Sequence, residues 1–396
     1  QRIAWGMGCF NNPSNMTAVM LSTSRKYRVP TVIESIAQDM PEEITNRERQ
    51  SYTSEDFERY GIRIDDPETA HLAWVVAKMA SLDNTEALLE RTEQHPSKWF
   101  DDVLRPLILR IREAYLELGR QGVDPGGQLD FLSLPAINKI TYRTPDYQLS
   151  AAQDYRKGEP AWHQHLWQAT LGSEAVVFTL HRSDNYVIPS RFWAGRFPRI
   201  AQHRNVLIAL YDIPEHPVLG PGTDPIPETL LLHETIAHFP RSVFDEVRED
   251  SEWIMARKGD AYVALRSQRP VVWRSSILLD QEGLLAKGRQ NVWLCQLGRK
   301  AVDGGFTEWS SKIASARLEL EDLSARFEAP GMGEMQFSWD GPLRVNGAEI
   351  GLDDYPRFDN PYCCAEHGND SYVITHGADR LMLDFGSNSR TEQMLA

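Results

Sequence analysis

The feature that most restricts the fold is a series of short apolar runs after residue 136. Each run has four to eight residues and is rich in β-branched or aromatic side chains, as β-strands are. The runs are 174–181, 205–211, 261–266, 291–297, 335–339, 372–375 and 381–384. Turn-forming clusters such as Asp340-Gly341-Pro342 and Asn346-Gly347 separate them. Many strands with few intervening helices favour an antiparallel sheet or sandwich. Segment 306–327 is the exception and reads as a helix that gives way to a strand.

The first part of the sequence has a helical pattern instead. Segment 97–118 is the strongest helix prediction, although Pro106 should kink or split that helix. Shorter helical segments are predicted at 14–25, 31–40, 54–61, 68–82 and 84–92. The Gly- and Pro-rich segment 119–135 is typical of a linker. We therefore expect a helical domain over 1–125 and an antiparallel β-sheet domain over 126–396.

Charge and composition exclude several classes of protein. The chain has 42 basic and 56 acidic residues, a net charge of −14, whereas nucleic-acid binders are usually basic. It has no apolar run long enough to span a membrane. Its four cysteines have neither zinc-site spacing nor the density of a disulfide framework. Glycine-rich phosphate loops and the GxSxG nucleophile motif are also missing from the sequence.

The densest polar and aromatic stretch is 141–171. It contains Tyr142, Arg143, Tyr147, Tyr155, His163 and His165. Because His163 and His165 are two residues apart, they would share one face of a strand. One imidazole could then act as a base while the other binds a metal or orients its neighbour. The alternative is an edge strand with a solvated polar face.

Local positive charge follows in residues 181–204. This window holds five arginines and one aspartate, a local charge of +4 with histidine neutral. Arginine suits bidentate binding of carboxylates or sulfates, so this window could bind an anionic ligand. The alternative interpretation is an ordinary surface loop whose arginines pair with acidic residues elsewhere in the chain. Further along, His233 and His238 have the spacing H-E-x-x-x-H, which does not match the HExxH zinc motif.

Several strings in the sheet part carry a family resemblance. They are TYRTPDYQLSAAQDYRKG, HQHLWQATLGSEAVVFTLH and RFWAGRFPRIAQHRNVLIALY, followed by ARKGDAYVALRSQRP, GRQNVWLCQLG and FSWDGPLRVNG. This pattern resembles the heparinase II/III-like superfamily, which includes polysaccharide lyases and many uncharacterised relatives. The resemblance covers residues 136–360 well and 1–118 more loosely. It implies an incomplete α/α toroid followed by an antiparallel β-sheet or sandwich domain, with the substrate in the cleft between them.

The resemblance also implies cleavage of a uronic-acid polysaccharide by β-elimination. That reaction needs a group that neutralises the carboxylate, a base for the C5 proton and an acid for the leaving O4. His165 is the best match to the base, with His163 as the other choice, and Tyr142 or Tyr155 would be the acid. The expected substrate-binding residues are Asn12, Arg143, His163, Arg191, Arg196, Arg199 and His238.

Two other functions stay open: a glycoside hydrolase that uses a carboxylate pair, and a non-catalytic carbohydrate-binding or assembly protein. The expected partner is an anionic polysaccharide or oligosaccharide, without nucleic acid or membrane, and a homo-oligomer is left open. No cofactor is required, although some relatives hold a divalent metal that His163, His203 or His238 could bind. The opening residues read as the middle of a domain, so we expect a segment upstream of Gln1. The substrate class favours a secreted or periplasmic protein, and a cytoplasmic one is also consistent.

Overall fold

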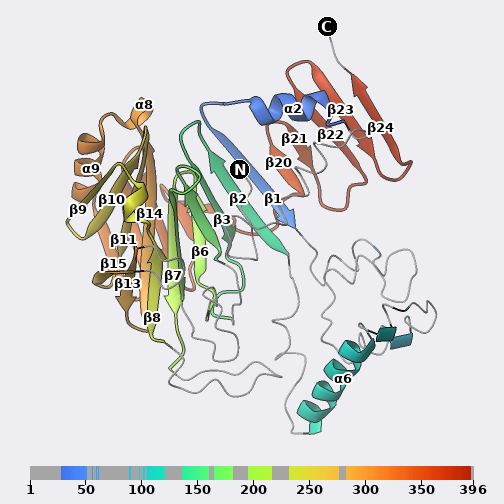
Figure 1. Cartoon of the computed structure of the whole chain (residues 1–396), viewed down its shortest axis with the longest axis horizontal. Helices are drawn as coiled ribbons and strands as arrows, with labels where there is room; N and C mark the ends of the chain where they lie inside the picture. The colour runs from blue at the N-terminus through green and yellow to red at the C-terminus, as the bar shows by residue number, and fades with distance from the viewer. Residues whose placement is uncertain are drawn as a thin grey trace. The chain divides into compact units, whose positions relative to one another are not determined.

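The chain divides into two compact units, which we describe separately. One unit comprises residues 50–137 with 216–231, and the other comprises the remainder. The computed structural model describes residues 28–50, 56, 59, 61, 89–90, 98, 101–102, 105–120, 136–159, 165–181, 195–215, 232–275 and 282–393. In the described part of the first unit, the longest element is helix α6 (Arg105–Arg120). All the sheets that the described residues form belong to the second unit (Figure 1).

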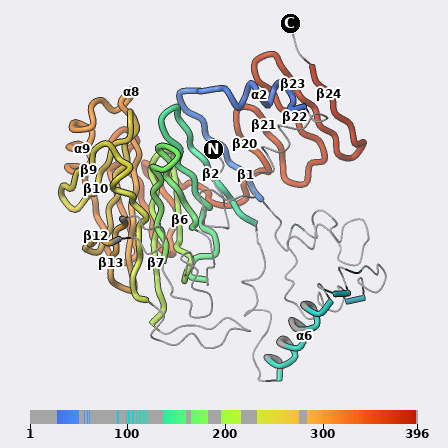
Figure 2. The backbone as a smooth tube through the Cα atoms, viewed as in Figure 1, coloured from blue at the N-terminus to red at the C-terminus, as the bar shows by residue number. Residues whose placement is uncertain are grey.

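The largest element of the second unit is a ten-stranded sheet. Its strands, in order across the sheet, are β12 (Val271–Ser275), β13 (Glu282–Lys287), β8 (Glu234–His238), β5 (Val176–His181), β4 (Trp167–Thr170), β3 (Gln148–Gln153), β2 (Ile137–Arg143), β1 (Ile44–Gln50), β20 (Phe358–Asn360) and β21 (Cys363–Ala365). Strand β1 is inserted between β2 and β20, where Arg47 lies opposite Asp359. Figure 2 follows this arrangement, with the blue β1 beside the green β2 and the red β20.

Three smaller sheets complete this unit. The six-stranded sheet contains β6 (Arg199–His203), β7 (Val206–Asp212), β14 (Gln290–Arg299), β11 (Ala261–Ser267), β10 (Trp253–Lys258) and β9 (Glu246–Asp250). The five-stranded sheet contains β15 (Leu318–Glu321), β16 (Ser324–Ala329), β17 (Gly333–Ser338), β18 (Leu343–Val345) and β19 (Ala348–Ile350). The three-stranded sheet contains β22 (Ser371–His376), β23 (Asp379–Asp384) and β24 (Ser389–Gln393). The short helices are α2 (Thr31–Gln38), η5 (Arg241–Val243), α8 (Lys300–Asp303) and α9 (Phe306–Ser315).

The six-stranded sheet is the middle layer of a three-layer core. On one side it meets the ten-stranded sheet, where the Tyr211 hydroxyl lies 2.8 Å from Thr179 Oγ1. Trp293 Nε1 also donates to Thr235 Oγ1 across this junction at 2.8 Å. On the other side, a hydrophobic cluster packs the sheet against the five-stranded sheet and α9.

Burial on both faces explains the composition of the central strands. In β7 the side chains of Ile208 and Leu210 belong to the cluster shared with the five-stranded sheet. The alternate residues, including Tyr211, point to the ten-stranded sheet, because successive side chains of a strand lie on opposite faces. Every residue from Val206 to Tyr211 is buried. A strand covered on both faces therefore reads as a continuous apolar run.

The fold-class prediction of an α/α toroid is wrong. In the described ranges, antiparallel sheets dominate, the helices are short, and no toroidal helical array is present. Strand β1 lies inside the predicted helical domain 1–125, because its edges pair with β2 and β20 and this tertiary pairing decides the local structure. The toroid was expected only because the family resemblance implies it.

Single helices were predicted with mixed accuracy. Helix α2 forms within the predicted segment 31–40. Within the predicted segment 97–118, α6 begins at Arg105, so Pro106 lies in its first turn, where a proline is tolerated. The predicted helices at 14–25 and 68–82 and the predicted linker, except its first two residues, lie outside the described residues. Among the helices that are described, none is long and apolar enough to cross a membrane.

Candidate functional site

A row of polar side chains crosses one face of the ten-stranded sheet. The register places Thr141, Ser150 and Gln168 opposite one another on β2, β3 and β4. Ser150 Oγ donates to Thr141 Oγ1 at 2.9 Å, and Gln168 Nε2 donates to Thr170 Oγ1 at 2.9 Å. Trp167 points to the opposite face, where its Nε1 donates to Oγ1 of Thr179. The same Thr179 hydroxyl contacts Tyr211 of the six-stranded sheet. The polar row therefore lies on the face turned away from the six-stranded sheet.

Two histidines stack on the two sides of Phe178 on this same face. The ring of His165 lies 4.1 Å from the Phe178 ring, and the ring of His238 lies 5.0 Å from it, both nearly parallel. Phe178 and His238 are directly opposite in the pairing of β5 with β8. His165 precedes β4 and reaches the row through its Nε2, which lies 3.0 Å from Gln168 Oε1. Strand register thus brings together residues that are far apart in the sequence.

The hydrogen bonds of Gln168 determine which nitrogen of His165 carries the proton. Because the amide nitrogen of Gln168 donates to Thr170, its oxygen faces His165 and accepts from Nε2. Nδ1 of His165 is then the nitrogen with the lone pair.

Burial keeps both imidazoles neutral. His165 is 6% exposed, and desolvation lowers its pKa to about 4, although the hydrogen bond to Gln168 opposes the shift. Desolvation, with a smaller contribution from His165, lowers the pKa of His238 to about 4. Near pH 7 both rings are therefore uncharged.

The predicted acid residues lie elsewhere. Tyr142 is opposite Leu149 in the sheet register, which places it on the face opposite to the polar row. Its hydroxyl donates to Glu43 at 2.6 Å, and burial together with this carboxylate raises its pKa. Tyr155 packs against Phe197 with ring centroids 5.5 Å apart, and burial raises its pKa as well. The contacts of these tyrosines therefore do not include His165.

The predicted arginines have separate environments. Arg199, the first residue of β6, binds Asp154 through two hydrogen bonds of 2.9 and 2.8 Å and also donates to backbone carbonyls of the segment 338–341, so it connects these parts of the core. Arg196 is buried, which lowers its pKa. Arg143 is half-buried and, together with Thr141 of the polar row, lines a cavity on that face of β2. The predicted residues Asn12, His163 and Arg191 lie outside the described residues.

The sequence did not point to three members of this site. Phe178, Gln168 and Ser150 were not predicted, although the run 174–181 correctly marked the strand that carries Phe178. Their roles follow from the register of neighbouring strands, which one sequence does not specify. Across the described ranges, no cluster of three or more His, Cys, Asp or Glu side chains is arranged to hold a metal ion.

Comparison with known proteins gives no match: no family model, curated protein or solved structure is similar to this chain. The resemblance of the sequence strings to the heparinase II/III-like superfamily therefore stays a prediction.

Proposed function

We propose that this chain cleaves a uronic-acid-containing polysaccharide by β-elimination, with His165 as the base for the C5 proton. The observation that carries the proposal is the buried, neutral imidazole of His165, which Gln168 orients and Phe178 supports by stacking. A neutral imidazole in a fixed orientation is suited to proton abstraction, which contributes about 10²–10⁴-fold to rate. The low pKa also predicts that the base stays unprotonated down to about pH 4.

The surrounding residues support a saccharide as the ligand. Hydroxyl and amide groups of Thr141, Ser150, Gln168 and Thr170 follow one another along the same face. Such groups can both donate to and accept from sugar hydroxyls, and a bound sugar would have to replace the contacts that the buried Ser150, Gln168 and Thr170 make with their neighbours. His238 would provide a second neutral imidazole on the other side of Phe178.

The proposed acid for the leaving O4 is Tyr142 or Tyr155, and each makes other contacts in the folded chain. Tyr142 is engaged with Glu43, and Tyr155 is packed on Phe197. Their part in the reaction remains a prediction, which the variants Tyr142→Phe and Tyr155→Phe would test by a loss of turnover.

The test is ultraviolet absorbance during incubation with heparan, chondroitin, hyaluronan, alginate and glucuronan. Elimination forms a conjugated C4–C5 double bond that absorbs, whereas hydrolysis does not. We expect absorbance to rise on at least one polymer and His165→Gln to lower the rate about 10²–10⁴-fold. His233→Gln, which changes an exposed histidine, is the matched control and should keep the wild-type rate.

Other outcomes would overturn the proposal. A folded His165→Gln protein with full activity would remove His165 as the base. New reducing ends without absorbance would indicate a hydrolase. Retention on a polysaccharide gel without any product would indicate a non-catalytic carbohydrate-binding protein.

A further inference from the structure

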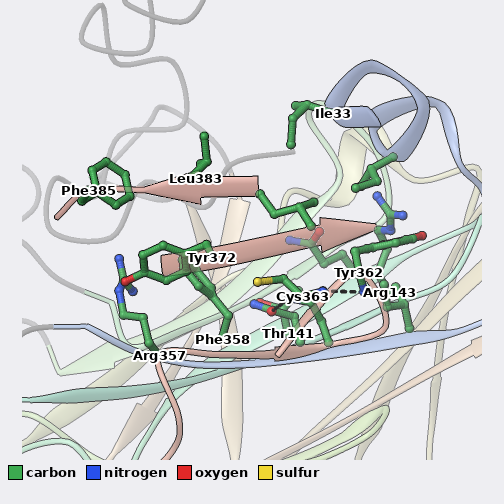
Figure 3. A pocket seen from close by; sticks show the side chains of 16 residues that line it. Ile33, Thr141, Arg143, Arg357, Phe358, Tyr362, Cys363, Tyr372, Leu383 and Phe385 are labelled. Carbon is green, nitrogen blue, oxygen red and sulfur yellow. Dashed lines mark hydrogen bonds between the residues drawn. The ribbon is translucent and has the colours of Figure 1, made fainter. Parts of the chain in front are cut away.

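A cavity of about 660 Å³ lies between α2, the β1–β21 end of the ten-stranded sheet and the three-stranded sheet (Figure 3). Its volume is within the range of small-molecule sites in proteins. The ten-stranded sheet contributes residues of β1, β2, β3, β20 and β21, and the three-stranded sheet contributes residues of β22 and β23. Three separate parts of the chain therefore enclose it.

Most of the cavity wall is apolar. Ile33 comes from α2, and Leu383 comes from the three-stranded sheet (Figure 3). Three aromatic rings follow one another along the wall: Phe358 lies 5.9 Å from Tyr372, which lies 5.8 Å from Phe385, both pairs edge to face. Such a wall favours a ligand with a flat apolar body, because aromatic rings pack well against another ring.

Two guanidinium groups lie at opposite ends of this apolar wall (Figure 3). Arg357 lies over the Phe358 ring at 4.4 Å and donates one hydrogen bond, of 3.1 Å, to the carbonyl oxygen of Arg49. Arg143 donates one hydrogen bond, of 3.2 Å, to the carbonyl oxygen of Asp39. A guanidinium has five N–H donors, so each group retains donors beyond these contacts.

The carboxylate of Asp39, whose backbone carbonyl accepts from Arg143, is already bound by other groups. The Asp39 carboxylate accepts from the Tyr362 hydroxyl at 2.6 Å and lies 3.1 Å from His376 Nε2. In the part of the chain that the structure describes, neither Arg143 nor Arg357 forms an ion pair with a carboxylate. The hydrogen bond from Tyr362 and, to a smaller extent, the charge of Arg143 lower the pKa of Asp39. Because neither guanidinium is held by a direct ion pair with a described residue, both can bind an anion from outside the chain.

We propose that this cavity binds a small organic anion with a flat apolar body. The aromatic wall receives the body, and Arg357 receives an acidic group as a carboxylate or sulfonate. Arg143, at the other end, receives a second acidic group when the ligand has one. The cavity shares Thr141 with the polar row, but His165, Gln168 and Phe178 do not line it.

The experiment is calorimetric titration of the whole chain with 2-naphthoate, 2,6-naphthalenedicarboxylate and neutral 2-naphthamide. We expect both acids to bind, and the amide to bind at least about tenfold more weakly, because only the acids pair with a guanidinium. Arg357→Gln should weaken both acids about tenfold or more. Arg143→Gln should weaken the dicarboxylate more than the monocarboxylate. Arg380→Gln, which changes an exposed arginine on β23, is the matched control and should bind like the wild type.

A second variant keeps the test decisive if loss of Arg357 disturbs folding. Leu383→Trp fills the apolar wall without removing a charge, so it should abolish binding of all three compounds while the circular dichroism spectrum is kept. Equal affinity for the acid and the amide would overturn the proposal. So would binding that neither arginine variant nor Leu383→Trp weakens, or no binding of either acid to the wild type.

Discussion

Replacing His165 by glutamine should make the stability of this protein less sensitive to acid. In the folded chain, burial lowers the pKa of His165 to about 4, against 6.5 in its unperturbed state. Between these two values the unfolded chain binds a proton that the folded chain excludes. The contribution of neutral His165 to the free energy of unfolding is therefore complete above about pH 6.5. It decreases as the pH falls and is fully lost below about pH 4.

The magnitude follows from the two pKa values. One unit of pKa shift corresponds to about 1.4 kcal/mol, so the whole window represents about 3 kcal/mol for one histidine. Integrating the proton difference from pH 7.5 to pH 5 gives a loss of about 2 kcal/mol from His165. His238 and His181, whose pKa values burial also lowers to about 4, contribute in the same direction and remain in the variant.

The assay is urea unfolding at pH 7.5 and pH 5, followed by tryptophan fluorescence, which includes the buried Trp167 beside His165. Between the two pH values, His165→Gln should lose about 2 kcal/mol less free energy of unfolding than the wild type. His233→Gln removes an exposed histidine and should follow the wild type. If the free energy of unfolding fell by the same amount between pH 7.5 and pH 5 in the wild type and in His165→Gln, the claim that His165 is buried and neutral would be refuted.

Two further predictions concern the core. Arg199→Met leaves the Asp154 carboxylate without its bidentate partner, so the free energy of unfolding should fall by about 3 kcal/mol, and an unchanged melting temperature would contradict this. Gly298→Ala should destabilise by about 1–3 kcal/mol, because the added Cβ would lie 2.5 Å from Trp309 Nε1. The control Gly305→Ala meets no atom within 4 Å and should melt close to the wild type, so equal losses in the two alanine variants would disprove the steric argument.

The sequence predicted the central strands well because their surroundings leave a strong local signal. The runs 205–211, 261–266 and 291–297 coincide with β7, β11 and β14 within a few residues. These strands form the middle layer, where both faces are covered, so almost every residue must be apolar. Composition alone is then sufficient to locate them.

The site could not be predicted to the same extent because it depends on strand register. His165 and His238 are far apart in the sequence, and the pairing of β4, β5 and β8 brings them to the two sides of Phe178. The prediction that His163 and His165 share a strand face also assumed a longer strand, whereas β4 begins at Trp167. Long-range pairing leaves little trace in a single sequence.

The position of β1 has a consequence for how this protein is made on the ribosome. Arg47 of β1 pairs with Asp359, 312 residues later, so one edge of β1 stays unpaired until β20 has been synthesised. At about 5–20 residues per second, that interval is roughly 15–60 s. An unpaired strand edge is a template for pairing with other chains. The nascent protein is therefore most prone to aggregation during this interval, and chaperones that cover strand edges should raise its yield.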